Sequence, residues 1–131
     1  MKKNKMLYIS KDNTTILKKT LKKAGYYIVE IPGNEIHNEK EFLTFMEQSF
    51  KLPDSAGWDS YADWMTDLDW IASRHICIVI NDYKRFLEFD TKSKKVAMSI
   101  FKADILPFWE REVLDTMVGG KTKSFMVYMV V

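Results

Sequence analysis

Short apolar runs alternate with longer segments of helical periodicity along the whole chain. The four runs are MLYIS (6–10), YYIVEI (26–31), HICIVI (75–80) and SFMVYMVV (124–131). They are rich in β-branched and aromatic residues, which favour strands. The third run is apolar at nearly every position, as expected of a strand buried on both faces. Strands separated by helices predict an α/β fold with a mainly parallel sheet.

The first two helical segments have clear start and stop signals. In the segment after the first run, apolar residues recur at helical spacing while Lys fills the other face. Asp12 or Asn13 is its expected N-cap, and Gly25 is its expected C-terminal stop. Asn38, with Glu41 three residues later, forms the pattern that begins a second helix.

Two further helices are expected, one before and one after the third strand. The first spans roughly residues 58–71 and follows the chain break at Pro53. The second extends from about residue 95 to 118, after a solvated turn at TKSKK, and ends at Gly119-Gly120. We expect Pro107 to divide this long pattern, because proline is tolerated mainly in the first turn of a helix.

Length and composition predict one domain over residues 1–131. The chain has 47% hydrophobic residues, which is enough to bury a core at this length. Its single cysteine, Cys77, lies in an apolar run, so we expect a buried free thiol in the reducing cytoplasm. The N-terminus lacks the apolar region of a signal peptide, and no segment is long enough to be a membrane span.

The formal net charge of +2 conceals a strong segregation of charge along the chain. Residues 1–24 contain eight Lys and one Asp, and the remainder contains 12 basic and 17 acidic residues. One segment, GWDSYADWMTDLDW (57–70), carries four Asp and lies in a stretch, 52–73, that has no Lys or Arg. This acidic segment is the most unusual feature of the sequence.

On a helix, the acidic segment separates into two stripes. The apolar stripe follows the i, i+3, i+4, i+7 spacing of a core-facing surface and consists of Trp58, Tyr61, Ala62, Met65 and Leu68. Beside it, Asp59, Asp63 and Asp67 recur every four residues. Like charges at this spacing destabilise a helix by roughly 0.2–0.5 kcal/mol per pair, a cost that the fold can carry for a binding purpose.

Several interpretations of these charges stay open from the residues alone. The aspartates could form a solvated face, a docking surface for a basic partner, or part of a Mg²⁺ site, which needs only one or two protein carboxylates. No phosphate-binding Gly loop accompanies them. The Lys-rich segment 2–23 provides the alternative function, a nucleic-acid-associated protein, although a solvated Lys face is the commoner outcome.

Residues 52–70 resemble the barstar-like ribonuclease inhibitors. The family's helix pattern, Trp/Leu-Asp-Ala-Leu-x-Asp-x-Leu-x-Asp-Leu-x-Trp, is similar to WDSYADWMTDLDW, and the order of elements is similar over 26–131. The resemblance implies a barstar-like layered fold with three to four mainly parallel strands flanked by helices. Residues 1–25 would then be a basic strand-helix element added to a barstar-like core at 26–131.

The resemblance also implies a function and a site. The chain would be a non-enzymatic immunity or antitoxin-type inhibitor without cofactor or metal, and its acidic helix would mimic RNA phosphates in a basic nuclease or related toxin. The family's two principal contact aspartates fall on Asp59 and Asp63. The predicted partner-binding set is completed by Asp67, Trp64, and the lead-in residues Ser55 and Gly57.

Four other residues have simpler predicted roles. Trp64 and Trp70 lie off the apolar stripe and are expected to pack against neighbouring elements, although Trp64 could instead be an exposed interface anchor. His37 and His75 have no metal-ligand spacing and are expected to be structural.

Overall fold

The computed structural model describes residues 3–116 and 120–131 and contains a four-stranded sheet in which every pair of neighbours is parallel. The strand order is β1-β4-β3-β2. The strands are β1 (Lys5–Ile9), β2 (Tyr27–Pro32), β3 (His75–Asn81) and β4 (Ser124–Val130). Each observed strand matches a predicted apolar run to within one residue at either end, so the predicted α/β parallel fold is confirmed.

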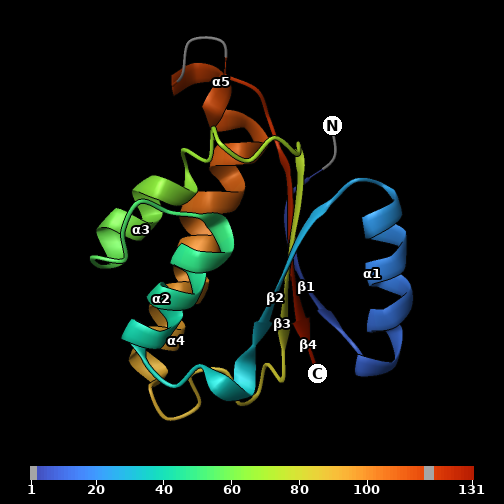
Figure 1. Cartoon of the computed structure of the whole chain (residues 1–131), viewed down its shortest axis with the longest axis vertical. Helices are drawn as coiled ribbons and strands as arrows, with labels where there is room; N and C mark the ends of the chain where they lie inside the picture. Colours follow the sequence, from blue (N-terminus) through green and yellow to red (C-terminus); the bar gives the residue numbers. More distant parts are fainter. Residues whose placement is uncertain (1–2, 117–119) are drawn as a thin grey trace.

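Helices cover the two faces of the sheet unequally. The α-helices are α1 (Thr14–Lys23), α2 (Glu39–Phe50), α3 (Trp58–Met65), α4 (Thr91–Ile100) and α5 (Val113–Thr116). Short 3-10 turns, η1 (Lys11–Asn13) and η2 (Gly33–Glu35), precede α1 and α2. Figure 1 shows α1 alone on one side of the sheet, with α2, α3 and the α4–α5 segment on the other.

Two separate cores lie on the two sides of the sheet. The larger one includes Ile76, Ile78 and Ile80 of β3, which pack beneath α2, α3 and α4 together with Phe42 and Phe101. The smaller core lies on the α1 side, toward which the alternate strand residues point. It consists of Cys77, Val79, Met126 and Val130, and Leu21 of α1 packs against it. The central strand β3 is therefore apolar on both faces, as its sequence predicts.

The start and stop signals of α1 and α2 act largely as expected. Gly25 follows the C-cap of α1 with a φ of +83°, a backbone conformation that favours glycine. The Asn38 side chain accepts a hydrogen bond from the Glu41 amide at 2.9 Å and caps α2. Asn13 precedes α1 but makes no side-chain cap; instead the Thr14 hydroxyl donates to the Lys11 carbonyl at 2.7 Å.

The expected division of the last helix at Pro107 is wrong. Helical structure continues from Thr91 through two π-helical segments, η3 (Phe101–Ile105) and η4 (Phe108–Glu112), to α5. The Leu106 amide bonds to the Phe101 carbonyl, five residues back, and this wider turn accommodates a proline that a regular α-helix would exclude. The remainder of the prediction, residues 117–119, lies outside the described residues.

The expected turn at TKSKK is also wrong, because these residues form the first half of α4. The Asp90 side chain accepts a hydrogen bond from the Ser93 amide at 3.1 Å and caps the helix. Ser93 and Ala97 then face the interior. Lys is a good helix former, so a cap and two buried small residues are sufficient to begin the helix here.

Candidate functional site

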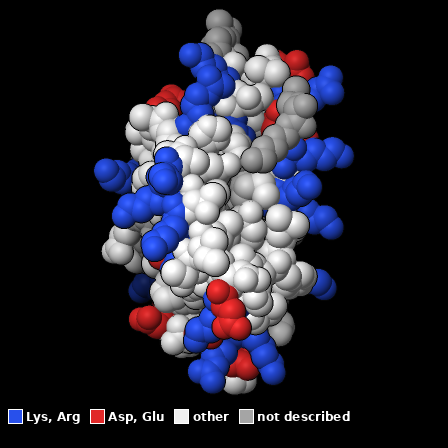
Figure 2. Space-filling view, turned by 90° about the vertical axis from the view of Figure 1, so that its right-hand side faces the viewer, with Lys and Arg blue, Asp and Glu red and all other residues white. Residues whose placement is uncertain are grey.

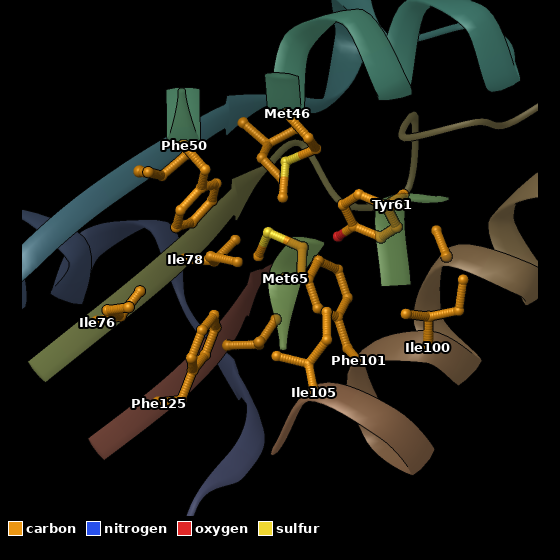
Figure 3. Packing of buried hydrophobic residues seen from close by; sticks show 14 of the residues in the cluster. Met46, Phe50, Tyr61, Met65, Ile76, Ile78, Ile100, Phe101, Ile105 and Phe125 are labelled. Carbon is orange, nitrogen blue, oxygen red and sulfur yellow. The ribbon is translucent and has the colours of Figure 1, made fainter. Parts of the chain in front are cut away.

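The inner face of the acidic helix α3 is anchored in the larger core, as the sequence predicts. Tyr61 and Met65 are buried, and Trp58 and Ala62 are half-buried against the same cluster. Figure 3 shows Tyr61 and Met65 among Phe101, Ile105 and Ile78. This packing fixes the rotation of α3 about its axis, and therefore determines which residues face outward.

The predicted extent of α3 is wrong, because the helix ends at Met65 and not near residue 71. The Thr66 hydroxyl bonds back to the Ala62 carbonyl at 2.9 Å, and Leu68 turns the chain with a φ of +41°. Leu68 is fully buried, so core packing compensates for this unusual backbone conformation. In addition, the Trp109 indole donates to the Met65 carbonyl at 2.8 Å and occupies an acceptor that a longer helix would have used.

Asp59 and Asp63 project from the outer face of α3. Both are exposed and stand four residues, about one turn, apart. Within residues 3–116 and 120–131, neither forms a salt bridge with Lys, Arg or His. Two adjacent carboxylates on a rigid helix thus remain available to an external cationic partner.

Asp67 occupies a different environment from the one predicted. It lies in the turn after α3, half-buried, and no longer continues the stripe of Asp59 and Asp63. Burial raises the pKa of Asp67, and a hydrogen bond with Asp69 and the negative charge of Asp69 raise it further. Asp67 and Asp69 therefore act as a pair.

A surface cavity of about 480 Å³ adjoins this pair. Its lining combines the two aspartates with three cations from other elements, Arg74, Lys121 and Lys123. Burial and the Arg74 charge lower the pKa of Lys123, while Asp69 opposes that change. Lys123 also donates to the Ile71 and Ser73 carbonyls at 2.9 and 2.8 Å. The far end of the acidic segment is thus partly balanced by distant residues, a result that local sequence does not reveal.

The lead-in to α3 is held by Asp54, which is not among the predicted site residues. Its carboxylate accepts hydrogen bonds from the Ala56 amide at 3.0 Å, the Ser60 hydroxyl at 2.8 Å and the Trp64 indole at 3.3 Å. The hydrogen bonds from Ala56 and Ser60 lower the pKa of Asp54, burial opposes them, and the bond from Trp64 lowers it further. An Asp that bonds the amide two residues on is a common turn signal, so Pro53-Asp54 could have been recognised.

The remaining predicted site residues lie next to this turn. Ser55 is exposed, and Gly57 is half-buried at the N-cap of α3 with an extended backbone. The Trp64 ring is half-buried, lies 6.4 Å from the Trp70 ring in an edge-to-face arrangement, and bonds to Asp54. The structure therefore assigns Trp64 a packing role at the back of the lead-in turn.

Other candidate residues have structural surroundings. His37 bonds to Glu41 at 2.8 Å, and His75 stacks on Tyr26 with 5.0 Å between ring centroids. In the described part of the chain, no three His, Cys, Asp or Glu side chains are grouped as metal ligands. Likewise, none of the helices described has the length and apolar character needed to cross a bilayer.

The fold and the acidic helix together define an α/β protein in which α3 presents two exposed carboxylates, Asp59 and Asp63, that form no salt bridge among the described residues. A family model described as Barstar (barnase inhibitor) matches residues 26–125. The chain therefore belongs to the barstar family. No match was found among curated proteins or solved structures. The matched region begins just before β2, so β1 and α1 precede it.

Proposed function

We propose that this protein inhibits a basic ribonuclease or related toxin by inserting α3 into the nuclease active site. Asp59 and Asp63 occupy the positions of RNA phosphates, and Asp63 lies at the centre of the contact. The observation that carries the proposal is the exposure of these two carboxylates on a helix whose opposite face is fixed in the core. Membership of a family described as barnase inhibitors supports the same partner class.

The physical basis is charge complementarity on a preorganised surface. A carboxylate that meets Arg side chains away from water forms short, charge-assisted hydrogen bonds. Because α3 is already ordered by Tyr61 and Met65, little conformational freedom is lost on binding. The acidic field of residues 52–73, which contain no Lys or Arg, increases the rate of encounter with a basic protein.

Asp67, Ser55, Gly57 and Trp64 have secondary roles in this proposal. Asp67 and Ser55 flank the contact, while Gly57 and Trp64 support the lead-in turn that presents α3. We place the complex in the cytoplasm, because Cys77 is a buried free thiol whose pKa burial raises to about 12, a group suited to a reducing compartment.

The test is inhibition of RNA cleavage by barnase and by any basic ribonuclease captured on the immobilised protein. Asp63→Ala is expected to weaken inhibition more than a hundredfold, since removing one partner of a desolvated ion pair costs roughly 3 kcal/mol or more. The association rate of the wild type should fall steeply as salt is added.

Asp104→Ala is the matched control, because Asp104 is an exposed helical aspartate outside the site and its loss changes the net charge equally. This variant should inhibit like the wild type. If Asp63→Ala also inhibits like the wild type, the site assignment is wrong. If the wild type inhibits no ribonuclease and captures none, the proposed function is wrong.

A further inference from the structure

A second charged surface lies on the opposite side of the molecule from α3. A groove of about 520 Å³ separates α1 from the edge strand β2. Its lining consists of Thr15, Lys18, Lys19, Lys22, Tyr26, Ile28 and Glu30. Figure 1 shows α1 and α3 on opposite sides of the sheet, and Figure 2 looks onto the α1 side, where Lys and Arg outnumber Asp and Glu. The proposed inhibitory function uses none of these residues.

One lysine of this groove is used internally, and the others are not. Lys18 forms an ion pair with Glu30 at 3.0 Å, and Asn81 also donates to Glu30 at 3.2 Å. Burial raises the pKa of Glu30, but these hydrogen bonds and the Lys18 charge outweigh that effect and lower it. Among the residues described, Lys19 and Lys22 have no salt-bridge partner, and neither does Lys23, which follows them on α1 just outside the lining of the groove. Three unpaired cations on one helix favour an anionic ligand.

A rigid aromatic ring stands next to these cations. Tyr26 stacks on His75 with an interplanar angle of 29°, and its hydroxyl lies 3.3 Å from the Ser124 hydroxyl. Tyr26 and Ile28 are half-buried against the smaller core, and both also line the groove. A fixed aromatic ring beside a row of Lys is the arrangement by which proteins stack an unpaired base while binding the backbone phosphates.

The same geometry disfavours a membrane surface as the ligand. A helix that enters a bilayer must expose its apolar face to the acyl chains. In α1, however, Leu21 packs against the smaller core and Thr14 is buried, so that face is already covered by the sheet. The exposed residues of α1 are Thr and Lys, apart from one large apolar side chain, Ile16. The groove therefore provides stacking and charge but no surface for insertion.

We propose that the groove between α1 and β2 binds single-stranded nucleic acid. Lys19 and Lys22 of the groove, with Lys23 beside it on α1, contact successive phosphates, and Tyr26 with Ile28 receives a base. Lys18 and Glu30 close one side of the groove. Because this surface lies across the sheet from α3, the protein can hold a nucleic acid and a nuclease at the same time.

The test is fluorescence anisotropy with a labelled oligouridine of about 12 nucleotides, its deoxy counterpart and a duplex of equal length. The full-length protein should bind both single strands more tightly than the duplex at about 50 mM salt. Binding of the RNA strand alone also supports the proposal and identifies RNA as the ligand. Preference for the duplex overturns it, as does binding only to anionic vesicles.

A matched pair of triple variants distinguishes the groove from net charge. Lys19→Gln, Lys22→Gln and Lys23→Gln together should weaken binding about tenfold or more and reduce the salt slope by about 2. Gln at the exposed Lys40, Lys84 and Lys95, which lie outside both α1 and the groove, removes the same charge and should have little effect. Equal loss in both triple variants overturns the proposal.

Two further variants test, separately, the stacking role of Tyr26 and the independence of the α3 surface. Tyr26→Leu keeps an apolar side chain but removes the ring, and should weaken single-strand binding about fivefold or more. Unchanged binding in this variant contradicts the assigned role of Tyr26. Asp63→Ala should bind nucleic acid like the wild type, because the α3 surface takes no part. Nucleic-acid binding by the groove and nuclease inhibition by α3 can therefore succeed or fail independently of each other.

Discussion

At the residue scale, two tryptophans hold the C-terminal ends of the helices around the site. Trp70 donates its indole N–H to the Phe50 carbonyl at the end of α2, at 2.7 Å, and Trp109 does the same for Met65 at the end of α3. The last carbonyls of a helix have no hydrogen-bond partner within the helix, so each indole N–H supplies the donor that such a carbonyl needs.

The different burial of these two tryptophans predicts different costs of removal. Trp109 is 3% exposed and Trp70 is 38% exposed. Trp109→Phe should lower the free energy of unfolding by roughly 2–3 kcal/mol, because the Met65 carbonyl is left buried without a donor. Trp70→Phe should cost about 1 kcal/mol or less, because Trp70 is itself 38% exposed and water can replace its indole N–H at the Phe50 carbonyl once the smaller ring is present. Urea unfolding of both variants measures this, and a larger loss at Trp70 would contradict it.

Tyr61 offers a second prediction, because its hydroxyl is buried without a hydrogen-bond partner among the described residues. Burial raises its pKa well above the ordinary value. Tyr61→Phe should therefore raise the free energy of unfolding at neutral pH by about 1 kcal/mol.

The same substitution should alter the response to alkaline pH. Because the folded-state pKa of Tyr61 is raised, its neutral form stabilises the fold below about pH 10 and that contribution is lost as the pH rises. The wild type should thus lose more stability than Tyr61→Phe above that pH. Tyr8→Phe is the control at neutral pH, since Tyr8 is 67% exposed and its substitution should leave the free energy of unfolding unchanged.

At the scale of elements, α3 depends on the turn that precedes it. Asp54 connects the lead-in backbone, through Ala56, to Ser60 and Trp64 of the helix. A short helix of eight residues receives little stability from its own hydrogen bonds, so contacts of this kind determine its position. Asp54 is therefore a positioning residue for the proposed inhibitory surface.

Comparison of Asp54→Ala with Asp54→Asn tests this role at constant net charge. Asn keeps an acceptor oxygen for the Ala56 amide, whereas Ala keeps none. Asp54→Ala should have the lower urea midpoint and the faster dissociation from the nuclease, with a similar salt dependence of association. Because hydrogen bonds lower the pKa of Asp54, its contribution is present above about pH 4 and is lost as the pH falls further. Equal behaviour of the two variants would show that the turn does not position α3.

At the scale of the whole molecule, the N-terminal strand and helix complete the fold. β1 pairs with β4, and Asn4 bonds to the Leu106 and Lys123 carbonyls at 3.1 Å and to the Phe125 amide at 2.9 Å. Leu21 of α1 covers the smaller core. This unit lies before the region that the family model matches, yet it carries one of the two layers of helices.

Deletion of residues 1–25 should therefore expose apolar surface. Cys77, Val79, Met126 and Val130 would lose their cover, so the fragment 26–131 should bind a hydrophobic dye strongly and self-associate. Dye fluorescence and sedimentation velocity measure these effects. The full-length triple variant of Lys19, Lys22 and Lys23 is the control and should behave like the wild type in both. A monomeric fragment that binds no dye would instead establish 26–131 as an independent core.

The sequence by itself determined the strands, the parallel α/β class and the apolar stripe of α3. Continuous apolar runs leave few alternatives to buried strands, and the stripe of Tyr61 and Met65 has one orientation that buries it. The aspartate pair Asp59 and Asp63 follows from the same periodicity, because residues four apart on a helix share a face. These features depend on local spacing, which a single sequence displays directly.

Only the tertiary structure decided where α3 ends and how its charges are divided. Trp109, far along the chain, takes the Met65 carbonyl, and the buried Leu68 turns the backbone away from the helix axis. Asp67 and Asp69 thereby line one cavity with Lys123 and Arg74, while Asp59 and Asp63 have no salt-bridge partner in the described part of the chain. Such pairings join residues distant in sequence, and their energies depend on burial and packing that no local pattern encodes.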